Sequence, residues 1–219
     1  MVATGCYPRD AESVLLVELD GLGVEVARNK HRVAEICRQN GARNITTAND
    51  AETRFKLWKG RKAAFAAAGK ISPNYFVQDG VIPRTQLVSV LQEIKALSEK
   101  YGYKIANIFH AGDGNLHPLI LYDNRVEGAW AEVEELGGEI LKLCVRVGGS
   151  LSGEHGIGID KNCYMPAMFN EIDLETMGYV RDCFNPKGLA NPGKLFPTPR
   201  SCGEAANAKI QGFAGVDVF

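Results

Sequence analysis

The middle of the sequence restricts the fold most, because two helical patterns enclose a pair of short strands. Between Pro83 and Gly102, apolar residues recur with the 3.6-residue period of a helix: Leu87, Val90, Leu91, Ile94 and Leu97. Residues 103–109 and 116–122 are then predicted to form a hairpin that turns about Asp113-Gly114. A second amphipathic pattern follows, made of Trp130, Val133, Ile140, Cys144 and Val147.

The flanking segments supply further elements. The apolar run 13–19, "SVLLVEL", predicts a buried strand, and helical patterns end at Gly41 and Gly69. Residues 74–83 predict a strand that runs into a turn, 171–184 a last helix, and "GGSLSGEHGIGID" is too rich in glycine for a regular element. This irregular order predicts an α+β fold, with a mostly antiparallel sheet and helices on one face, instead of a doubly wound parallel sheet.

Composition narrows the class of partner. The 219 residues carry 25 basic and 26 acidic side chains spread along the chain, for a net charge of −1. No basic patch indicates nucleic acid or a membrane surface. No apolar run is long enough to span a bilayer, and the first residues lack the pattern of a signal peptide. We therefore expect a cytoplasmic or peripheral protein whose partner is a small molecule or another protein.

Two of the four histidines lie at the ends of the predicted hairpin. A turn about Asp113-Gly114 would place His110 directly opposite His117, with Cβ atoms roughly 4.5–5.5 Å apart. Two such imidazoles can share one divalent ion at about 2.0–2.1 Å per nitrogen, and Glu154 is the candidate carboxylate ligand. The alternative is that both histidines only cap the hairpin, while Glu154 and His155 lie in a solvated loop.

The glycines near these residues favour the metal interpretation. Both segments are crowded with glycine, which permits tight bends and close approach to a ligand: Gly112, Gly114, Gly153, Gly156 and Gly158. A metal-dependent hydrolase is a weaker interpretation of the same residues, because the ligands lie on a hairpin and a loop and there is no HExxH helix.

Three motifs in order resemble a known family. "HAGDGNLHP", "GGSLSGEHGIG" and "NPGKLFP" look like the C-terminal, substrate-side domain of the FAD-linked oxidases of the vanillyl-alcohol oxidase type. Within that family they resemble the flavoprotein component of glycolate oxidase and the related D-lactate and D-2-hydroxyglutarate dehydrogenases. The resemblance implies a ferredoxin-like cap domain over residues 1–198, followed by a loose tail over 199–219.

The resemblance also implies roles for single residues. His110, His117 and Glu154 match the family's divalent metal ligands, with zinc favoured. His155 resembles the general base that takes the hydroxyl proton as hydride leaves for the flavin. Arg61 of "LWKGR" resembles the arginine that clamps the substrate carboxylate. Asn191 resembles a residue close to the flavin, where Glu154 and His155 are also expected.

These roles agree with elementary chemistry. A 2-hydroxy acid offers a carboxylate to an arginine fork and a hydroxyl whose pKa a Lewis acid lowers. A histidine with an ordinary pKa near 6.5 can then accept the proton. Two simpler interpretations stay open: Arg61 lies among lysines on a helix whose charged face could be only solvated, and Asn191 could be only a turn residue before Pro192.

The sequence also departs from the family's pattern. The flavin-binding half that normally precedes this domain is not seen, nor is the first strand and helix of the domain itself, so we expect a fragment or one part of a split enzyme with an exposed sheet edge. Pro118-Leu119 follows His117 where related enzymes tend to have an asparagine, and Val77 takes the place of their second-carboxylate lysine. These differences favour a small monocarboxylate substrate.

Two hypotheses follow. The first is the substrate- and metal-binding domain of a flavin-dependent D-2-hydroxy-acid dehydrogenase, which depends on FAD bound mostly by a separate half. The second is a binding or assembly module that keeps the fold without turnover. Expected partners are the flavin-binding half, an iron–sulfur subunit that could hold the protein at a membrane, and a second copy of the chain.

Overall fold

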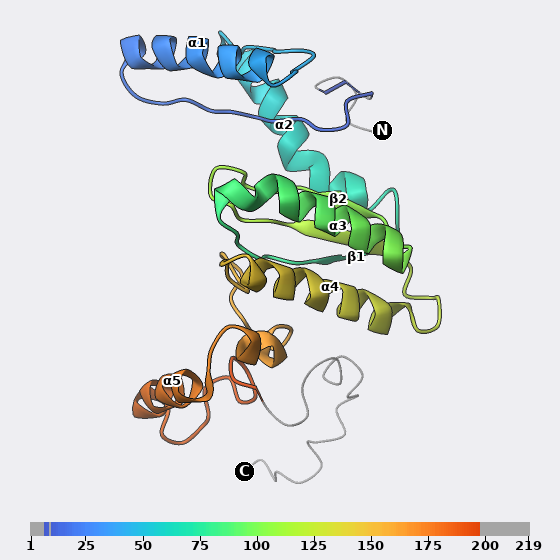
Figure 1. Ribbon diagram of the computed structural model, residues 1–219, viewed down its shortest axis with the longest axis vertical. Helices are drawn as coiled ribbons and strands as arrows, with labels where there is room; N and C mark the ends of the chain where they lie inside the picture. Colours follow the sequence, from blue (N-terminus) through green and yellow to red (C-terminus); the bar gives the residue numbers. More distant parts are fainter. Residues whose placement is uncertain (1–6, 9, 198–219) are drawn as a thin grey trace, which may run out of the picture. The chain divides into compact units, whose positions relative to one another are not determined.

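The computed structural model describes residues 7, 8 and 10–197, and the chain divides into two compact units that meet in sequence at Ala67 and Ala68 (Figure 1). The first unit contains α1 (Gly23–Gln39) and most of α2 (Ala51–Ala68). The α1 helix ends in a left-handed turn, in which Gly41 has a φ of 79° and the Ala42 N–H donates to the Cys37 carbonyl at 2.9 Å. Both predicted helices are confirmed.

The predicted strand at 13–19 is wrong. The segment has no ladder partner, and the described part of its unit contains no strand with which it could pair. Its apolar side chains are largely exposed, with Leu15 at 66% and Val14 at 49%. An apolar run supplies the side chains of a strand, but its N–H and C=O groups form a strand only when another strand lies beside them.

The second unit contains a three-stranded antiparallel sheet in the order β1-β3-β2. The strands are β1 (Asn74–Val77), β2 (Ile105–Asn107) and β3 (Pro118–Tyr122). A short 3₁₀ turn, η1 (Arg84–Gln86), leads into α3 (Leu87–Tyr101), and α4 (Ala129–Arg146) follows β3.

Both helices pack on one face of the sheet. On that face, Ile120 of β3 packs with Val90 and Ile94 of α3 and with apolar residues of α4: Val133, Leu136, Ile140, Leu143 and Cys144. Phe76 and Ile105, the neighbours of Ile120 on the flanking strands, pack against the same cluster. The α+β prediction is confirmed, including the antiparallel sheet and the helices on one face.

The hairpin register differs from the prediction by two residues. The β2–β3 pairing joins Ile105 to Ile120 and continues to a bridge between His110 and Asn115. The turn therefore occupies the four residues 111–114, and the Asp113 N–H donates to the His110 carbonyl at 3.1 Å. His110 is not directly opposite His117, but because the shift is an even number both residues stay on the same face.

A single antiparallel β-bridge lies at the position that a fourth strand of the sheet would occupy. After α4, Ser150 pairs with Val81, each donating its N–H to the other's carbonyl at 2.9 Å. Val81 also pairs with Asn115, so the extension of β1 lies between two neighbours. The order β-α-β-β-α followed by this bridge matches the split β-α-β pattern of ferredoxin-like domains.

The last described segments pack against another side of α4. A second buried cluster, Leu141, Leu151 and Met165, is covered by Leu174 and Met177 of α5 (Glu171–Phe184). The short 3₁₀ helix η2 (Asn162–Ala167) precedes α5. The α5 helix matches the predicted range, while the predicted tail from Thr198 lies outside the described residues. Among the described helices, none combines the length and apolarity needed to cross a bilayer.

Candidate metal centre

The extension of β1 brings Asp79 next to His117. The β1–β3 ladder pairs Val77 with Leu119, and the same register continues to the bridge of Val81 with Asn115. Asp79, on the extension of β1, therefore lies opposite His117, which directly precedes β3. Both residues are buried, with 0% of Asp79 and 3% of His117 exposed.

The loop that contains Glu154 and His155 is tied to Asp79 by its backbone. The Asp79 carbonyl accepts from the Gly153 N–H at 2.9 Å, and its carboxylate Oδ2 accepts from the N–H groups of Gly153, Glu154 and His155 at 3.2, 3.2 and 2.8 Å. Ser152 Oγ donates to the same oxygen at 2.6 Å and accepts from the Gly156 N–H at 2.7 Å. The loop thus folds around one carboxylate.

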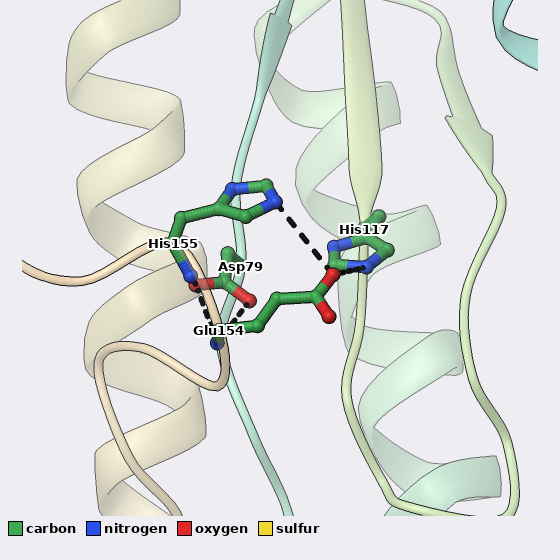
Figure 2. A group of neighbouring side chains, drawn as sticks. All are labelled: Asp79, His117, Glu154 and His155. Carbon is green, nitrogen blue, oxygen red and sulfur yellow. Dashed lines mark hydrogen bonds and ion pairs between the residues drawn. The ribbon is translucent and has the colours of Figure 1, made fainter.

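This anchoring places three candidate ligands together. Glu154 Oε1 lies 2.9 Å from His117 Nε2 and 3.7 Å from His155 Nε2 (Figure 2). The rings of His117 and His155 are stacked, with centroids 5.2 Å apart and planes 3° from parallel. His110 lies beside them, with its ring centroid 5.6 Å from that of His117 in an edge-on arrangement.

Close approach of the loop depends on a glycine. A Cβ atom at Gly153 would lie 2.7 Å from the Asn115 amide and 2.7 Å from a Val81 methyl group, closer than real contacts allow. The Asn115 amide oxygen is buried and, within the described part of the chain, has no hydrogen-bond partner. Because Asn115 precedes His117 by two residues along an extended segment, both side chains lie on one face.

Hydrogen bonds and a nearby positive charge keep the Asp79 carboxylate ionised. Burial by itself would raise the pKa of the Asp79 carboxyl, but the hydrogen bonds from Ser152 and the His155 N–H, with the positive charge of Lys161, lower that pKa well below its ordinary value. Lys161 Nζ lies 3.3 Å from Asp79 Oδ2. Burial lowers the pKa of the Lys161 ammonium, and Asp79 opposes that effect.

The donor set fits a divalent cation. Ligand atoms of Asp79, His117, Glu154 and His155 all lie within 4.8 Å of one another. Imidazole and carboxylate are the usual protein ligands of zinc, at about 2.0–2.2 Å from the ion, so small movements would bring such atoms around one ion. The unpartnered Asn115 oxygen beside them is a further polar group that a bound ion with its water could satisfy.

The other predicted site residues belong to other segments of the chain. Arg61 lies on α2 in the first unit, with its guanidinium 6.0 Å from the centre of the Phe65 ring. Asn191 has a left-handed backbone with a φ of 47°. Its loop is tied to the segment after the His155 loop, since the Leu195 N–H donates to the Gly158 carbonyl at 2.8 Å and the Asn162 amide donates to the Gly193 carbonyl at 3.3 Å.

Sequence reasoning missed two residues of this centre, Asp79 and Lys161. The signal for Asp79 was its place directly after an apolar strand, in "YFVQDG", where a charged residue is unexpected unless it is paired. Lys161 gave no local signal, because its partner is 82 residues away in the sequence.

Comparisons with known proteins agree with this architecture. Residues 2–195 match the family model "FAD linked oxidases, C-terminal domain". The chain is 51% identical over 198 residues to Glycolate oxidase subunit GlcD of Escherichia coli, and the aligned region covers 90% of this chain and 40% of that protein. It is 32% identical over 189 residues to Glycolate oxidase subunit GlcD of Bacillus subtilis, covering 86% and 40%.

A more distant relative comes from a vertebrate. The chain is 30% identical over 185 residues to a probable mitochondrial D-lactate dehydrogenase of Danio rerio, covering 83% of this chain and 37% of that protein. The chain thus spans about two fifths of the length of these relatives. The family match covers most of the chain and includes the strand extension, the hairpin and the loop that form the candidate metal centre. This chain belongs to the FAD-linked oxidases, as a C-terminal domain of that oxidoreductase family.

Proposed function

We propose that this chain is the substrate- and metal-binding domain of a flavin-dependent D-2-hydroxy-acid dehydrogenase of the glycolate oxidase or D-lactate dehydrogenase type. The observation that carries the proposal is the convergence of His117, Glu154 and His155 on one point. The relatives' names support the reaction class, and the cluster of imidazole and carboxylate groups supports a bound cation beside the substrate. We take residues 1–198 as one functional domain.

In this proposal, His117, Glu154 and His110 hold a divalent ion, with zinc favoured by the nitrogen and oxygen donors. The bound ion would supply Lewis acidity toward the substrate hydroxyl. His117 is buried directly before β3, whereas the His155 side chain is 51% exposed and can reach a substrate. His155 is therefore proposed to accept the hydroxyl proton.

Arg61 is proposed to bind the substrate carboxylate through its guanidinium, which offers two parallel N–H donors. Asn191, with Glu154 and His155, is proposed to lie near the flavin of FAD, which would be held mostly by a flavin-binding domain. Hydride acceptance is the chemistry that the flavin supplies when it is bound. An iron–sulfur subunit and a second copy of the chain are further proposed partners, with a cytoplasmic location at a membrane through such a subunit.

The substrate is proposed to be a small monocarboxylate such as glycolate or D-lactate. Val77 and Leu119 are cross-strand partners in the β1–β3 ladder, two residues before Asp79 and two residues after His117. Leu119 is fully buried, and neither side chain can form an ion pair with a second carboxylate. This apolar pair supports a substrate with one carboxylate.

Metal binding is the first test. The purified chain, stripped of metal by a chelator, is titrated with Zn²⁺ by calorimetry beside His117→Ala, Glu154→Gln and His31→Ala. We expect about one equivalent in the wild type, and an affinity lowered by about 100-fold or more in the first two variants. His31 lies on the exposed side of α1 and serves as the matched histidine control. Equal binding by all variants would exclude this centre.

Turnover is tested after the flavin-binding half is supplied. Bleaching of the flavin absorbance by glycolate or D-lactate measures hydride transfer. His155→Asn should leave zinc binding nearly intact and slow the bleaching by roughly 10²–10⁴-fold. Arg61→Met should raise KM by about 10–100-fold, the loss expected for a charged hydrogen bond. Zinc binding without flavin reduction by either acid would instead favour the binding or assembly module.

A further inference from the structure

Asp79 is the most heavily hydrogen-bonded side chain around the metal centre, and the proposed reaction gives it no role. Its carboxylate receives the hydroxyl of Ser152, the ammonium of Lys161 and the backbone N–H groups of Gly153, Glu154 and His155. The residue is fully buried, behind the loop whose side chains face the site.

These donors converge on one oxygen of the Asp79 carboxylate. An ionised carboxylate has about four lone-pair positions. All five donors contact Oδ2, and the Glu154 N–H also reaches Oδ1 at 3.3 Å. A metal ion bound at Oδ2 would displace N–H groups that would then be buried without partners, which is unfavourable for each of them, so this oxygen supports the loop.

Lys161 makes the buried carboxylate tolerable. Its side chain is 7% exposed and lies 3.3 Å from Asp79 Oδ2, so neither charge is left without an opposite charge. Lys161 also immediately precedes η2, and its N–H donates to the Ile157 carbonyl at 3.2 Å. The ion pair therefore connects the strand extension to the end of the loop, while the hydrogen bonds from residues 152–155 connect it to the start.

We propose that Asp79, supported by Lys161 and Ser152, is a positioning residue that holds the backbone of Glu154 and His155 in the geometry required for metal binding before an ion arrives. This inference rests on the metal centre proposed above and adds that the loop of that centre is held in place before the metal binds. Glu154 and His155 lie on a loop, whose side chains would otherwise have to be ordered at the moment of binding.

The test uses Asp79→Asn, which keeps the shape of the side chain and one acceptor oxygen but removes the negative charge that the N–H groups and the Lys161 ammonium contact. Amide hydrogen exchange of the metal-free chain should show the N–H groups of 153–155 exchanging faster by roughly an order of magnitude, while α3 and α4 exchange as before. Zinc affinity should fall by about 10–100-fold. Ser152→Ala should change both quantities in the same direction by less.

Two controls separate positioning from general stability. Asp50 is an aspartate that also accepts a backbone N–H, from Thr53 at 2.7 Å, but at the exposed start of α2. Asp50→Asn should leave zinc affinity unchanged. Ile140→Ala weakens the core beneath the sheet without contacting the loop, and should lower stability but leave the zinc affinity of the folded chain unchanged.

A double variant gives the decisive comparison. In Asp79→Asn/Lys161→Met the unpaired ammonium is removed, so stability should partly return while zinc affinity stays low. If zinc affinity returns with stability, or if Asp79→Asn leaves the 153–155 amides protected, Asp79 is only a charge partner and the inference is overturned. If the wild type binds no zinc, the proposed function fails, and the exchange result alone decides whether Asp79 anchors the loop.

Discussion

Replacing Gly114 with alanine should destabilise the turn beside the proposed metal centre and so weaken zinc binding there. Gly114 closes the turn between the two strands of the hairpin with a φ of 71°, and its carbonyl accepts from the Ile82 N–H at 3.0 Å. An alanine Cβ at this position would lie 2.1 Å from the Ile82 carbonyl oxygen, which belongs to the backbone and cannot rotate away.

The cost can be worked out from these contacts. Since contacts below 3.0 Å essentially never occur, the two segments must separate by about 0.9 Å. A left-handed alanine costs roughly 1–2 kcal/mol. The separation also breaks or weakens the Ile82–Gly114 and Leu116–Gly80 hydrogen bonds, each worth about 0.5–1.5 kcal/mol. The free energy of unfolding should therefore fall by about 2–5 kcal/mol.

Gly112 provides a matched control within the same turn. It has no left-handed φ, and a Cβ there would meet nothing within 4 Å. Urea unfolding followed by circular dichroism should place Gly112→Ala within about 0.5 kcal/mol of the wild type. Zinc affinity should fall only in Gly114→Ala, because the separated segments contain Val81, which contacts the Glu154 loop. Equal loss in both variants, or less than about 1 kcal/mol in Gly114→Ala, would refute the reasoning.

Four further predictions concern α4 and its contacts. Burial raises the pKa of the Cys144 thiol to about 12, so iodoacetamide should alkylate exposed Cys183 within the native chain and Cys144 only after unfolding, as peptide mass mapping will show. Since the folded pKa is raised, the stability from the neutral thiol is present below about pH 8.5 and is lost as the pH rises toward 12. Cys144→Ala should therefore lose less stability between pH 8 and 11 than the wild type does. A Cβ at Gly80 would lie 2.5 Å from Cys144 Sγ, so Gly80→Ala should cost less stability in a Cys144→Ala background, and an additive double-mutant cycle would contradict that contact. Ile140→Ala should lower the free energy of unfolding by about 2–5 kcal/mol.

The helices and the sheet were largely predictable because their signals are local. Residues 171–184 show this best, since a capping box formed by Asn170 and Asp173 fixes the start of the helix where the pattern begins. The run 13–19 shows the limit. Its residues favour a strand, but whether a strand forms depends on a neighbour that the pattern does not specify.

The candidate site was predictable only in part. Periodicity placed His110 and His117 on one face, but a turn of four residues at 111–114, instead of two, moved the register so that Asn115 faces His110. Asp79 could not be predicted as the loop anchor, because its role arises from residues that are distant in sequence and meet it only through the bridge of Val81 with Ser150.

That long separation has a kinetic consequence. The hydrogen bonds of the Asp79 carboxylate join residues 73 to 82 positions apart, whereas the hairpin and the helices are built from near neighbours. Closing so long a loop is entropically unfavourable until α3, the hairpin and α4 are in place, so the Asp79 contacts should form after the folding transition state. In stopped-flow refolding with a zinc-loaded, metal-sensitive dye, the chain should therefore take zinc from the dye during the slowest phase. Substitutions at Asp79 should speed unfolding while leaving the folding rate nearly unchanged.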